Sequence, residues 1–330
     1  MTYPYPQTTF IETTTECNYR CRYCHMWTTK EGASSLTTSE KLRVINEFWA
    51  MNPNGELVLT GGETMGKGAE FFALTGRCRE LRLKCAANTN GSYIDASNLD
   101  KLLINGPNYL VLSLDSHVPA IHDYARGVPG SHADVVQKVR MLMSRRAELG
   151  LAEHTLIFTN SVIFDRNIGS MIDYVRFASA LGIDGVTFQM LSPTFYRKGN
   201  GDQFYAQHFF PDRRSAIDDV QKLLNRLGEF PVIKTTAQDF SWMQMYIADP
   251  EFLGDAVCGS HERNIMIDSY GEVQLCFNMK KLLGGQSVGN VRQKPLSELW
   301  RSSNAMRARE VMSECRRSCG MLNCHRRRDT

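Results

Sequence analysis

Three cysteines lie within eight residues near the start of the chain, in the stretch CNYRCRYC at positions 17–24. Thiolates bind soft metal ions, and four of them complete a zinc site or the ligand set of an iron–sulfur cluster. Cys17, Cys21 and Cys24 supply only three ligands, which leaves one position open. Because an open position on a metal can receive a reactant, this spacing indicates metal-dependent chemistry.

Five more cysteines gather toward the other end of the chain, at Cys258, Cys276, Cys315, Cys319 and Cys324. In a reducing compartment, clustered thiols indicate metal binding or catalysis rather than disulfides. Cys78 and Cys85 lie apart, in a helical and a strand pattern respectively. Buried free cysteines are common in such elements, so we expect both to contribute to packing.

The composition is typical of a soluble globular protein. The 330 residues are 42% hydrophobic and 22% charged, and a net charge of +3 is too small to indicate nucleic-acid binding. The basic run at 326–328 is interpreted as a solvated tail. The N-terminal stretch has neither the charged nor the apolar region of a signal peptide, and no stretch approaches the roughly 18 apolar residues of a membrane span. We therefore expect a cytoplasmic protein.

The elements that must position the first cysteines follow an alternating pattern. Strands are predicted over 9–15, 56–61, 83–89, 109–115, 154–164 and 184–191. Helices are predicted near 38–51, 68–80, 97–104, 131–149, 168–181 and 212–227. Crossovers of this length join parallel strands, so the fold class is α/β, a partial (β/α)6 barrel of the TIM type. Functional groups should lie at the carboxyl ends of its strands.

The pattern changes after the barrel. We assign residues 1–228 to the barrel and 229–256 to a connecting segment, in which WMQMYI (242–247) is interpreted as a packing face that could also line a site. Residues 257–330 should form a small α+β domain with strands near 264–268 and 272–276, a helix near 296–310 and the second group of cysteines.

The first cysteines, spaced Cys-x3-Cys-x2-Cys directly after the first strand, resemble the signature of the radical S-adenosylmethionine (radical SAM) superfamily. In that family three thiolates hold a [4Fe–4S] cluster whose fourth iron is chelated by S-adenosylmethionine. Reductive cleavage of this cofactor gives a 5′-deoxyadenosyl radical, which abstracts hydrogen from an unactivated C–H bond. A structural zinc site with a neighbouring ligand such as His25 is the alternative interpretation.

Further segments, in the expected order, extend the resemblance. Tyr23 occupies the position whose aromatic ring lies against the adenine in the family. Gly61, Gly62 and Glu63 end the second strand and resemble the motif that receives the methionine amino group. Glycines allow close backbone approach, and a carboxylate pairs an ammonium. Arg126, in HDYARG, resembles the arginine that binds the cofactor carboxylate, with a solvated helix end as the alternative.

Polar residues at the ends of later strands are further candidates for cofactor contact. They are Asn90, Ser113, Asp115, Asn160 and Gln189. The alternative for Ser113 and Asp115 is ordinary turn chemistry at a strand end.

The C-terminal cysteines, together with Gly271, "GNV" and "ELW" in order, resemble the SPASM or shorter twitch extension of radical SAM enzymes. There a hairpin carries the first pair of ligands and a helix delivers the others, which implies a second [4Fe–4S] cluster. Five cysteines exceed four ligand places by one, and the spare thiol is one of Cys315, Cys319 and Cys324. A spare thiol could donate a hydrogen atom in an epimerisation. A zinc site is again the alternative.

The resemblance implies a substrate with an unactivated C–H bond and a protein reductant such as flavodoxin or ferredoxin. A ribosomally made peptide, changed by epimerisation, thioether formation or carbon–carbon crosslinking, is the favoured substrate. The motif begins so close to residue 9 that we expect no leader-recognition domain ahead of it. The alternative substrate is a carbohydrate or aminocyclitol that is epimerised or dehydrogenated. A zinc-binding interaction module is the remote alternative. We expect neither nucleic acid nor membrane as a partner.

Overall fold

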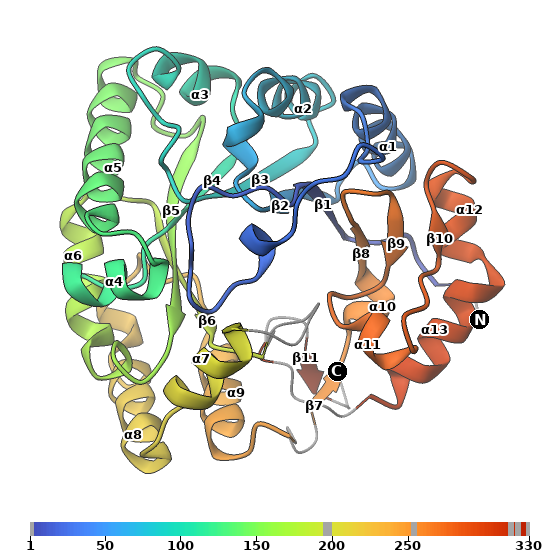
Figure 1. Ribbon diagram of the computed structural model, residues 1–330. Helices are drawn as coiled ribbons and strands as arrows, with labels where there is room; N and C mark the ends of the chain where they lie inside the picture. Colours follow the sequence, from blue (N-terminus) through green and yellow to red (C-terminus); the bar gives the residue numbers. More distant parts are fainter. Residues whose placement is uncertain (1–2, 194–199, 252–255, 316–319, 321–324, 328–330) are drawn as a thin grey trace.

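A computed structural model describes residues 3–193, 200–251, 256–315, 320 and 325–327 (Figure 1). Its main sheet has the strand order β10-β9-β8-β1-β2-β3-β4-β5-β6. The strands of this sheet are β1 Thr8–Thr14, β2 Glu56–Gly61, β3 Lys84–Thr89, β4 Tyr109–Ser113, β5 Leu156–Ile163, β6 Gly185–Met190, β8 Asn264–Ile267, β9 Glu272–Gln274 and β10 Gly289–Asn290. A separate pair consists of β7 Ala256–Cys258 and β11 His325–Arg327.

Helices cover the outside of this sheet (Figure 1). Those of the barrel are α1 Thr38–Met51, α2 Ala69–Glu80, α3 Leu99–Asn105, α4 Pro119–Arg126, α5 Ser131–Glu148, α6 Met171–Ala180, α7 Asn200–His208, α8 Arg213–Leu224 and α9 Ala237–Ala248. The later ones are α10 Ser260–Arg263, α11 Met279–Leu282, α12 Leu296–Arg301 and α13 Ser303–Ser313. Short 3-10 turns are η1 Met26–Thr28, η2 Thr64–Lys67, η3 Ile168–Ser170 and η4 Leu227–Glu229.

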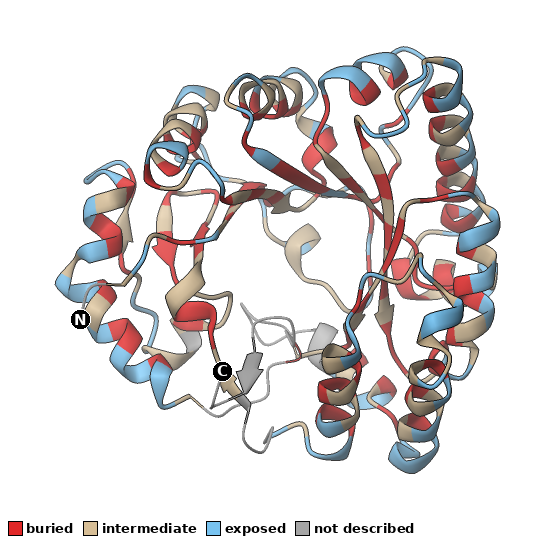
Figure 2. Ribbon diagram, turned by 180° about the vertical axis from the view of Figure 1, so that it is seen from behind, coloured by how far each residue is buried: buried red, intermediate tan, exposed pale blue. Residues whose placement is uncertain are grey.

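The six predicted parallel strands and the partial barrel are confirmed. Strands β1 to β6 pair in parallel in sequence order. Buried and half-buried residues alternate strictly along β5, because every second side chain points into the helical layer. Figure 2 shows the same division on the helices, whose buried residues face the sheet and whose exposed residues face solvent. The carboxyl ends of all six strands therefore open on one side.

The C-terminal strands continue the barrel sheet. Strand β8 pairs in parallel with β1, from Thr8↔Asn264 to Ile11↔Ile267, and β9 and β10 follow in antiparallel order. The strands predicted near 264–268 and 272–276 are thus present, but they share one sheet with the barrel. The expected boundary between residues 228 and 257 does not coincide with a break in that sheet.

Residues 229–256, predicted as a connecting segment, contain helix α9. Helix α9 begins at a capping box in which Thr236 and Asp239 each accept a hydrogen bond from the other's backbone N–H. Trp242, Met243 and Tyr246, from the WMQMYI stretch, are buried in the core, which confirms the packing interpretation.

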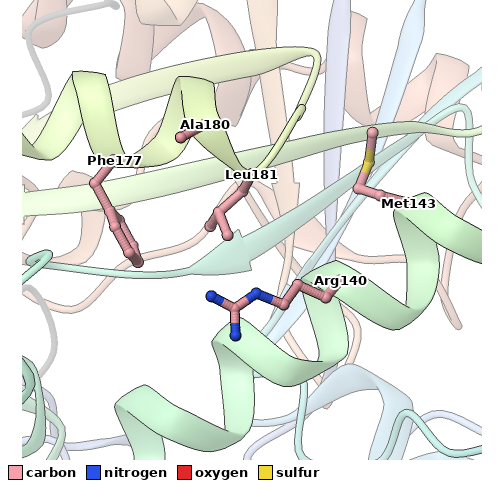
Figure 3. Close-up of a pocket in the computed structure, with 5 residues that line it drawn as sticks. All are labelled: Arg140, Met143, Phe177, Ala180 and Leu181. Carbon is pink, nitrogen blue, oxygen red and sulfur yellow. The ribbon is translucent and has the colours of Figure 1, made fainter.

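Cys78 and Cys85 are also fully buried in the core, as predicted. A hollow of about 340 Å³ lies between α5 and the end of α6, among the outer helices (Figure 3). It is lined by Arg140, Met143, Phe177, Ala180 and Leu181 and lies outside the barrel. Within the described residues, no helix combines the length and the apolarity that a membrane span needs.

Candidate active site

The loop between β1 and α1 carries the first three cysteines and lies across the mouth of the barrel (Figure 1). Its start is bound to the end of β2, where the N–H groups of Gly62 and Glu63 donate to the carbonyls of Thr14 (2.7 Å) and Glu16 (2.8 Å). A Cβ on Gly62 would lie 2.0 Å from the Glu16 oxygen. Glycine is required here because the backbone of the cysteine loop passes directly against it.

The neighbouring Gly61 is constrained in the same way. It has φ +125°, and a Cβ would lie 2.3 Å from the Thr14 oxygen. From the sequence, these glycines are predicted to allow close approach of the cofactor. The close approach seen in the structure is to the loop that carries the cysteines, so the GGE motif first fixes the position of that loop.

The three thiols are shielded from water to different degrees. Cys21 is buried, Cys17 and Cys24 are half-buried, and the N–H of Cys24 donates to the carbonyl of Cys21 at 3.1 Å. Burial raises the pKa of all three thiols, that of Cys21 to about 12. Thiolates in such a site need positive charge beside them, and cluster irons supply it. Three thiols on one loop with no carboxylate among them fit an iron–sulfur cluster.

The zinc alternative gains no support from the geometry. Among the residues that the structure describes, no three His, Cys, Asp or Glu side chains are arranged to hold a single metal ion. A four-iron cluster is wider than one ion and needs sulfurs that are farther apart.

Glu63 is a buried carboxylate held in one orientation by three donors. Its Oε1 accepts from the Met65 N–H (3.0 Å) and the Thr89 hydroxyl (2.6 Å), and its Oε2 accepts from the Asn90 N–H (2.7 Å). Burial raises the pKa of Glu63, against the effect of these bonds. A carboxylate has about four acceptor positions, so one remains for a further donor. This is compatible with the predicted partner, the methionine ammonium.

Asn90 joins this carboxylate to the cysteine loop. Its side-chain amide donates to the Asn18 side chain at 2.9 Å and lies 4.0 Å from the Cys17 sulfur. The predicted residues Cys17, Glu63 and Asn90, from three separate segments, are therefore neighbours.

Asp115 is the most densely bonded of the predicted site residues. Arg126 binds it through two nitrogens, with Nε to Oδ2 and Nη2 to Oδ1 both at 2.8 Å. The Tyr23 hydroxyl donates to Oδ2 at 2.9 Å, and the Val162 N–H donates to Oδ1 at 3.0 Å. Each carboxylate oxygen of Asp115 thus accepts two hydrogen bonds from the protein, which fills its acceptor positions. This position favours a role in which Asp115 orients Tyr23 and Arg126, rather than the cofactor contact predicted for it.

The backbone of Asp115 is fixed as firmly as its side chain. Its carbonyl accepts from Ser161 (2.9 Å) and Asn167 (2.7 Å), and its N–H donates to Nδ1 of His122 at 3.1 Å. Burial lowers the pKa of His122 to about 3, so its imidazole is neutral and can accept this bond. Arg126 also lies over the Tyr23 ring, 5.4 Å from its centroid.

The other predicted contacts lie on neighbouring strands. Ser113 and Asn160 are register partners on β4 and β5, and the Asn160 side chain accepts from the Thr187 hydroxyl at 2.9 Å. Gln189 lies on β6 opposite Val162. All are at the carboxyl side of the sheet, where the barrel fold places functional groups.

Sequence reasoning missed Glu12, which lies within β1 and is 8% exposed. Burial raises its pKa to about 7, and its Oε1 accepts from the Ser269 N–H at 3.3 Å. The neighbouring Phe10 packs edge-on against Phe277, with ring centroids 5.2 Å apart. A single acidic residue in an otherwise β-rich run was the signal that could have marked this position.

The second group of cysteines is described in part. Cys258 ends β7, Cys276 follows β9, and Cys315 follows α13, while Cys319 and Cys324 lie outside the described residues. Between the first two, β8 and β9 form a hairpin that turns at Gly271, whose φ is +87°. This agrees with the predicted arrangement of a hairpin followed by a helix. The choice of four ligands among five cysteines stays a prediction.

Two sequence families match the chain. Residues 11–161 match the Radical SAM superfamily, and residues 258–325 match SPASM, an iron-sulfur cluster-binding domain. The chain belongs to the radical SAM superfamily and carries a SPASM domain. It is accordingly a radical SAM enzyme whose cofactors are [4Fe–4S] clusters and S-adenosylmethionine.

The alignments with two named relatives cover most of this chain. An AdoMet-dependent heme synthase of Nitratidesulfovibrio vulgaris is 22% identical over 325 residues, which cover 96% of this chain and 84% of the relative. The subtilosin biosynthesis protein AlbA of Bacillus subtilis is 22% identical, over 88% of this chain and 58% of that protein.

Solved structures share the fold. SuiB of Streptococcus suis bound to S-adenosylmethionine aligns with a TM-score of 0.71 and 16% identity, over 97% of this chain and 72% of its own. The enzyme anSMEcpe with bound AdoMet and a peptide gives 0.63 and 17%, over 91% and 81%. At these identities the likeness establishes the fold alone.

Proposed function

We propose that Cys17, Cys21 and Cys24 hold the cluster that acts on S-adenosylmethionine, and that the substrate is a ribosomally made peptide. The observation that carries the first part is the meeting of Cys17, Glu63 and Asn90 at the barrel mouth. When bound, the cluster and S-adenosylmethionine supply a 5′-deoxyadenosyl radical that abstracts hydrogen from a C–H bond.

The chain's own residues divide the binding of the cofactor between them. Glu63 offers its remaining acceptor position to the methionine ammonium. Arg126 keeps Nη1 for the methionine carboxylate, because its Nε and Nη2 are used by Asp115. Tyr23 offers an aromatic ring to the adenine, and its hydroxyl is fixed by Asp115. Each contact is preset before the cofactor binds, which lowers the cost of ordering it.

Two observations support a peptide as the substrate. SuiB aligns as a complex with its precursor peptide SuiA at a TM-score of 0.70, and AlbA takes part in the synthesis of a bacteriocin.

The heme synthase relatives favour a second candidate, a carboxylate-rich tetrapyrrole. The half-buried positions near the carboxyl ends of β2, β4, β5 and β6 are Thr60, Ser113, Asn160 and Gln189, all neutral, and β1 adds the acidic Glu12. These five strands carry no Lys or Arg, so the cations that would bind a carboxylate-rich substrate lie outside them. The aminocyclitol alternative has a weaker structural parallel in BtrN with AdoMet and 2-DOIA, at a TM-score of 0.50.

The test has two stages under anaerobic conditions. The reconstituted enzyme with S-adenosylmethionine and dithionite should release 5′-deoxyadenosine, and a lack of release would refute the role of the first cysteines. Short peptides encoded beside the gene are then added, and their products are analysed by mass spectrometry. Loss of two hydrogens indicates a crosslink or oxidation, and uptake of one solvent deuterium indicates epimerisation. An unchanged peptide beside an altered tetrapyrrole or aminocyclitol would exclude the peptide assignment.

A further inference from the structure

Three exposed arginines lie on or near the cysteine loop: Arg20 and Arg22 within it, and Arg166 in the segment after β5, over the same Tyr124 ring as Arg22. We call them the arginine rim. Exposed arginines are usually mobile, and holding such a side chain in one conformation costs entropy. Each arginine of the rim is nevertheless held in place by the chain.

Arg20 is attached to the cysteine loop itself. Its Nη1 donates to the carbonyls of Cys17 (3.0 Å) and Tyr19 (3.1 Å), and its guanidinium carbon lies 5.2 Å from the centroid of Trp27. Arg20 is therefore hydrogen-bonded to the backbone of Cys17, and it directly precedes Cys21 in the sequence.

Arg22 and Arg166 share one aromatic support. Their guanidinium carbons lie 4.5 Å and 4.1 Å from the centroid of the Tyr124 ring, and Nε of Arg22 donates to the Tyr124 carbonyl at 2.9 Å. Stacking of a guanidinium on an aromatic face is favourable and fixes its plane.

The Tyr124 side chain is itself held in place by hydrogen bonds. The Tyr124 hydroxyl bonds to Nε2 of His208 at 2.9 Å, and Nδ1 of His208 bonds to Asp165, also at 2.9 Å. These two hydrogen bonds link α4 and α7 to the segment that follows β5.

The charges of the rim are not compensated. In the part of the chain that the structure describes, none of the three guanidiniums forms a salt bridge. The neighbouring carboxylates have other partners, since Glu16 pairs with Lys67 and Asp165 bonds to His208. Some exposed arginines elsewhere, such as Arg145 and Arg226, pair with carboxylates. Others, such as Arg213 and Arg301, are stacked on an aromatic ring and form no salt bridge among the described residues.

We propose that the arginine rim is the docking surface of an acidic electron-carrier protein that reduces the first cluster. The proposal rests on the proposed function, because only a cluster that must be reduced needs such a partner. The carrier gives up one electron, and the enzyme accepts it. Ordered, unpaired guanidiniums bind carboxylates with little further loss of entropy, and the rim places the carrier against the loop that holds the cysteines.

The first experiment measures binding without turnover. Reduced flavodoxin and reduced ferredoxin are titrated onto the holoenzyme at low and high salt. For the parent, affinity for at least one carrier should fall as salt rises, since exposed charges are screened. Arg22→Glu and Arg166→Glu should each weaken binding about tenfold at low salt and flatten its salt dependence. Arg214→Glu, on the exposed surface of α8, is the matched control and should bind like the parent. Failure of both carriers to bind the parent would overturn the proposal.

The second experiment compares reductants. Release of 5′-deoxyadenosine by the two rim variants should fall about tenfold with the carrier and stay unchanged with dithionite, a small reductant that needs no docking. Equal losses with both reductants in Arg166→Glu, which lies outside the cysteine loop, would assign the rim to cluster integrity and overturn the proposal. So would unchanged carrier-driven rates with impaired use of an acidic peptide, because the occupant would then be the substrate. If the parent releases nothing with dithionite, the proposed function fails, while the binding experiment still judges the rim.

Discussion

The charged side chains on the two sides of the cysteine loop differ in whether they have a partner of opposite charge. On the inner side, Asp115, Arg126 and Tyr23 satisfy one another in a buried network. On the outer side, Arg22 and Arg166 are fixed by the uncharged Tyr124 and have no acidic partner among the described residues. A buried charge must be compensated within the chain, because its removal from water is costly. An exposed one can remain available to a partner that arrives later.

The largest expected effect follows from removing the ligands between these two sides. Replacing Cys17, Cys21 and Cys24 together by Ala should lower the iron content of the anaerobic protein from about eight atoms to about four, because two four-iron clusters become one. Release of 5′-deoxyadenosine should stop with every reductant. Iron analysis and the visible spectrum measure this change. Retention of all the iron would show that both clusters are held elsewhere.

The inner side is tested next, by a pair of matched substitutions. Asp115→Asn leaves the buried Arg126 without its counter-charge, and breaking a buried ion pair costs about 3–5 kcal/mol of unfolding free energy. Asp100→Asn disturbs a pair of the same design, because Arg145 binds Asp100 through two nitrogens at 2.7 Å. That pair is exposed, so its loss should change stability far less. Urea unfolding of both variants makes the comparison, and equal losses would contradict it.

The barrel and the cysteine motifs were predictable because they follow from local pattern. Strand β5 alternates along its length, and the first cysteines are close neighbours in sequence. The role of Asp115 was not predictable in this way, because its partners lie up to 92 residues away, at Tyr23. The same holds for Tyr124, whose hydroxyl meets His208 across 84 residues. Only the fold brings such residues together, and a sequence pattern cannot show which polar groups it will satisfy.

A third prediction concerns Glu12, a buried acid that no cation of the chain neutralises by direct contact among the described residues. Its folded pKa of about 7 lies above the ordinary 4.5, mainly through burial. The folded state therefore binds more protons than the unfolded state between these values, and stability falls as pH rises through that window. Glu12→Gln should remove this fall. Relative to the parent it should gain about 3 kcal/mol between pH 4.5 and 7, at 1.36 kcal/mol per pKa unit. Parallel curves for both proteins would show that Glu12 titrates normally.

The smallest expected effect belongs to Glu63, on the inner side. Three protein donors bind its carboxylate, and one acceptor position remains for the cofactor. Glu63→Gln preserves size but replaces an acceptor oxygen by an amide, so the bond to the methionine ammonium loses its charge. A hydrogen bond to a charged group contributes about 1.5–3 kcal/mol, which corresponds to a roughly tenfold to hundredfold weaker affinity for S-adenosylmethionine.

Equilibrium binding of S-adenosylmethionine to the reconstituted protein measures this loss, with iron content as the check that the cluster is intact. Glu16→Gln is the control, because the Glu16 side chain is exposed and pairs with Lys67. It should leave the affinity unchanged. If the Glu63 variant binds the cofactor like the parent, then the only role of the Glu63 carboxylate is to accept its three hydrogen bonds from the protein. The GGE motif would then serve only to position the cysteine loop, as its glycines do.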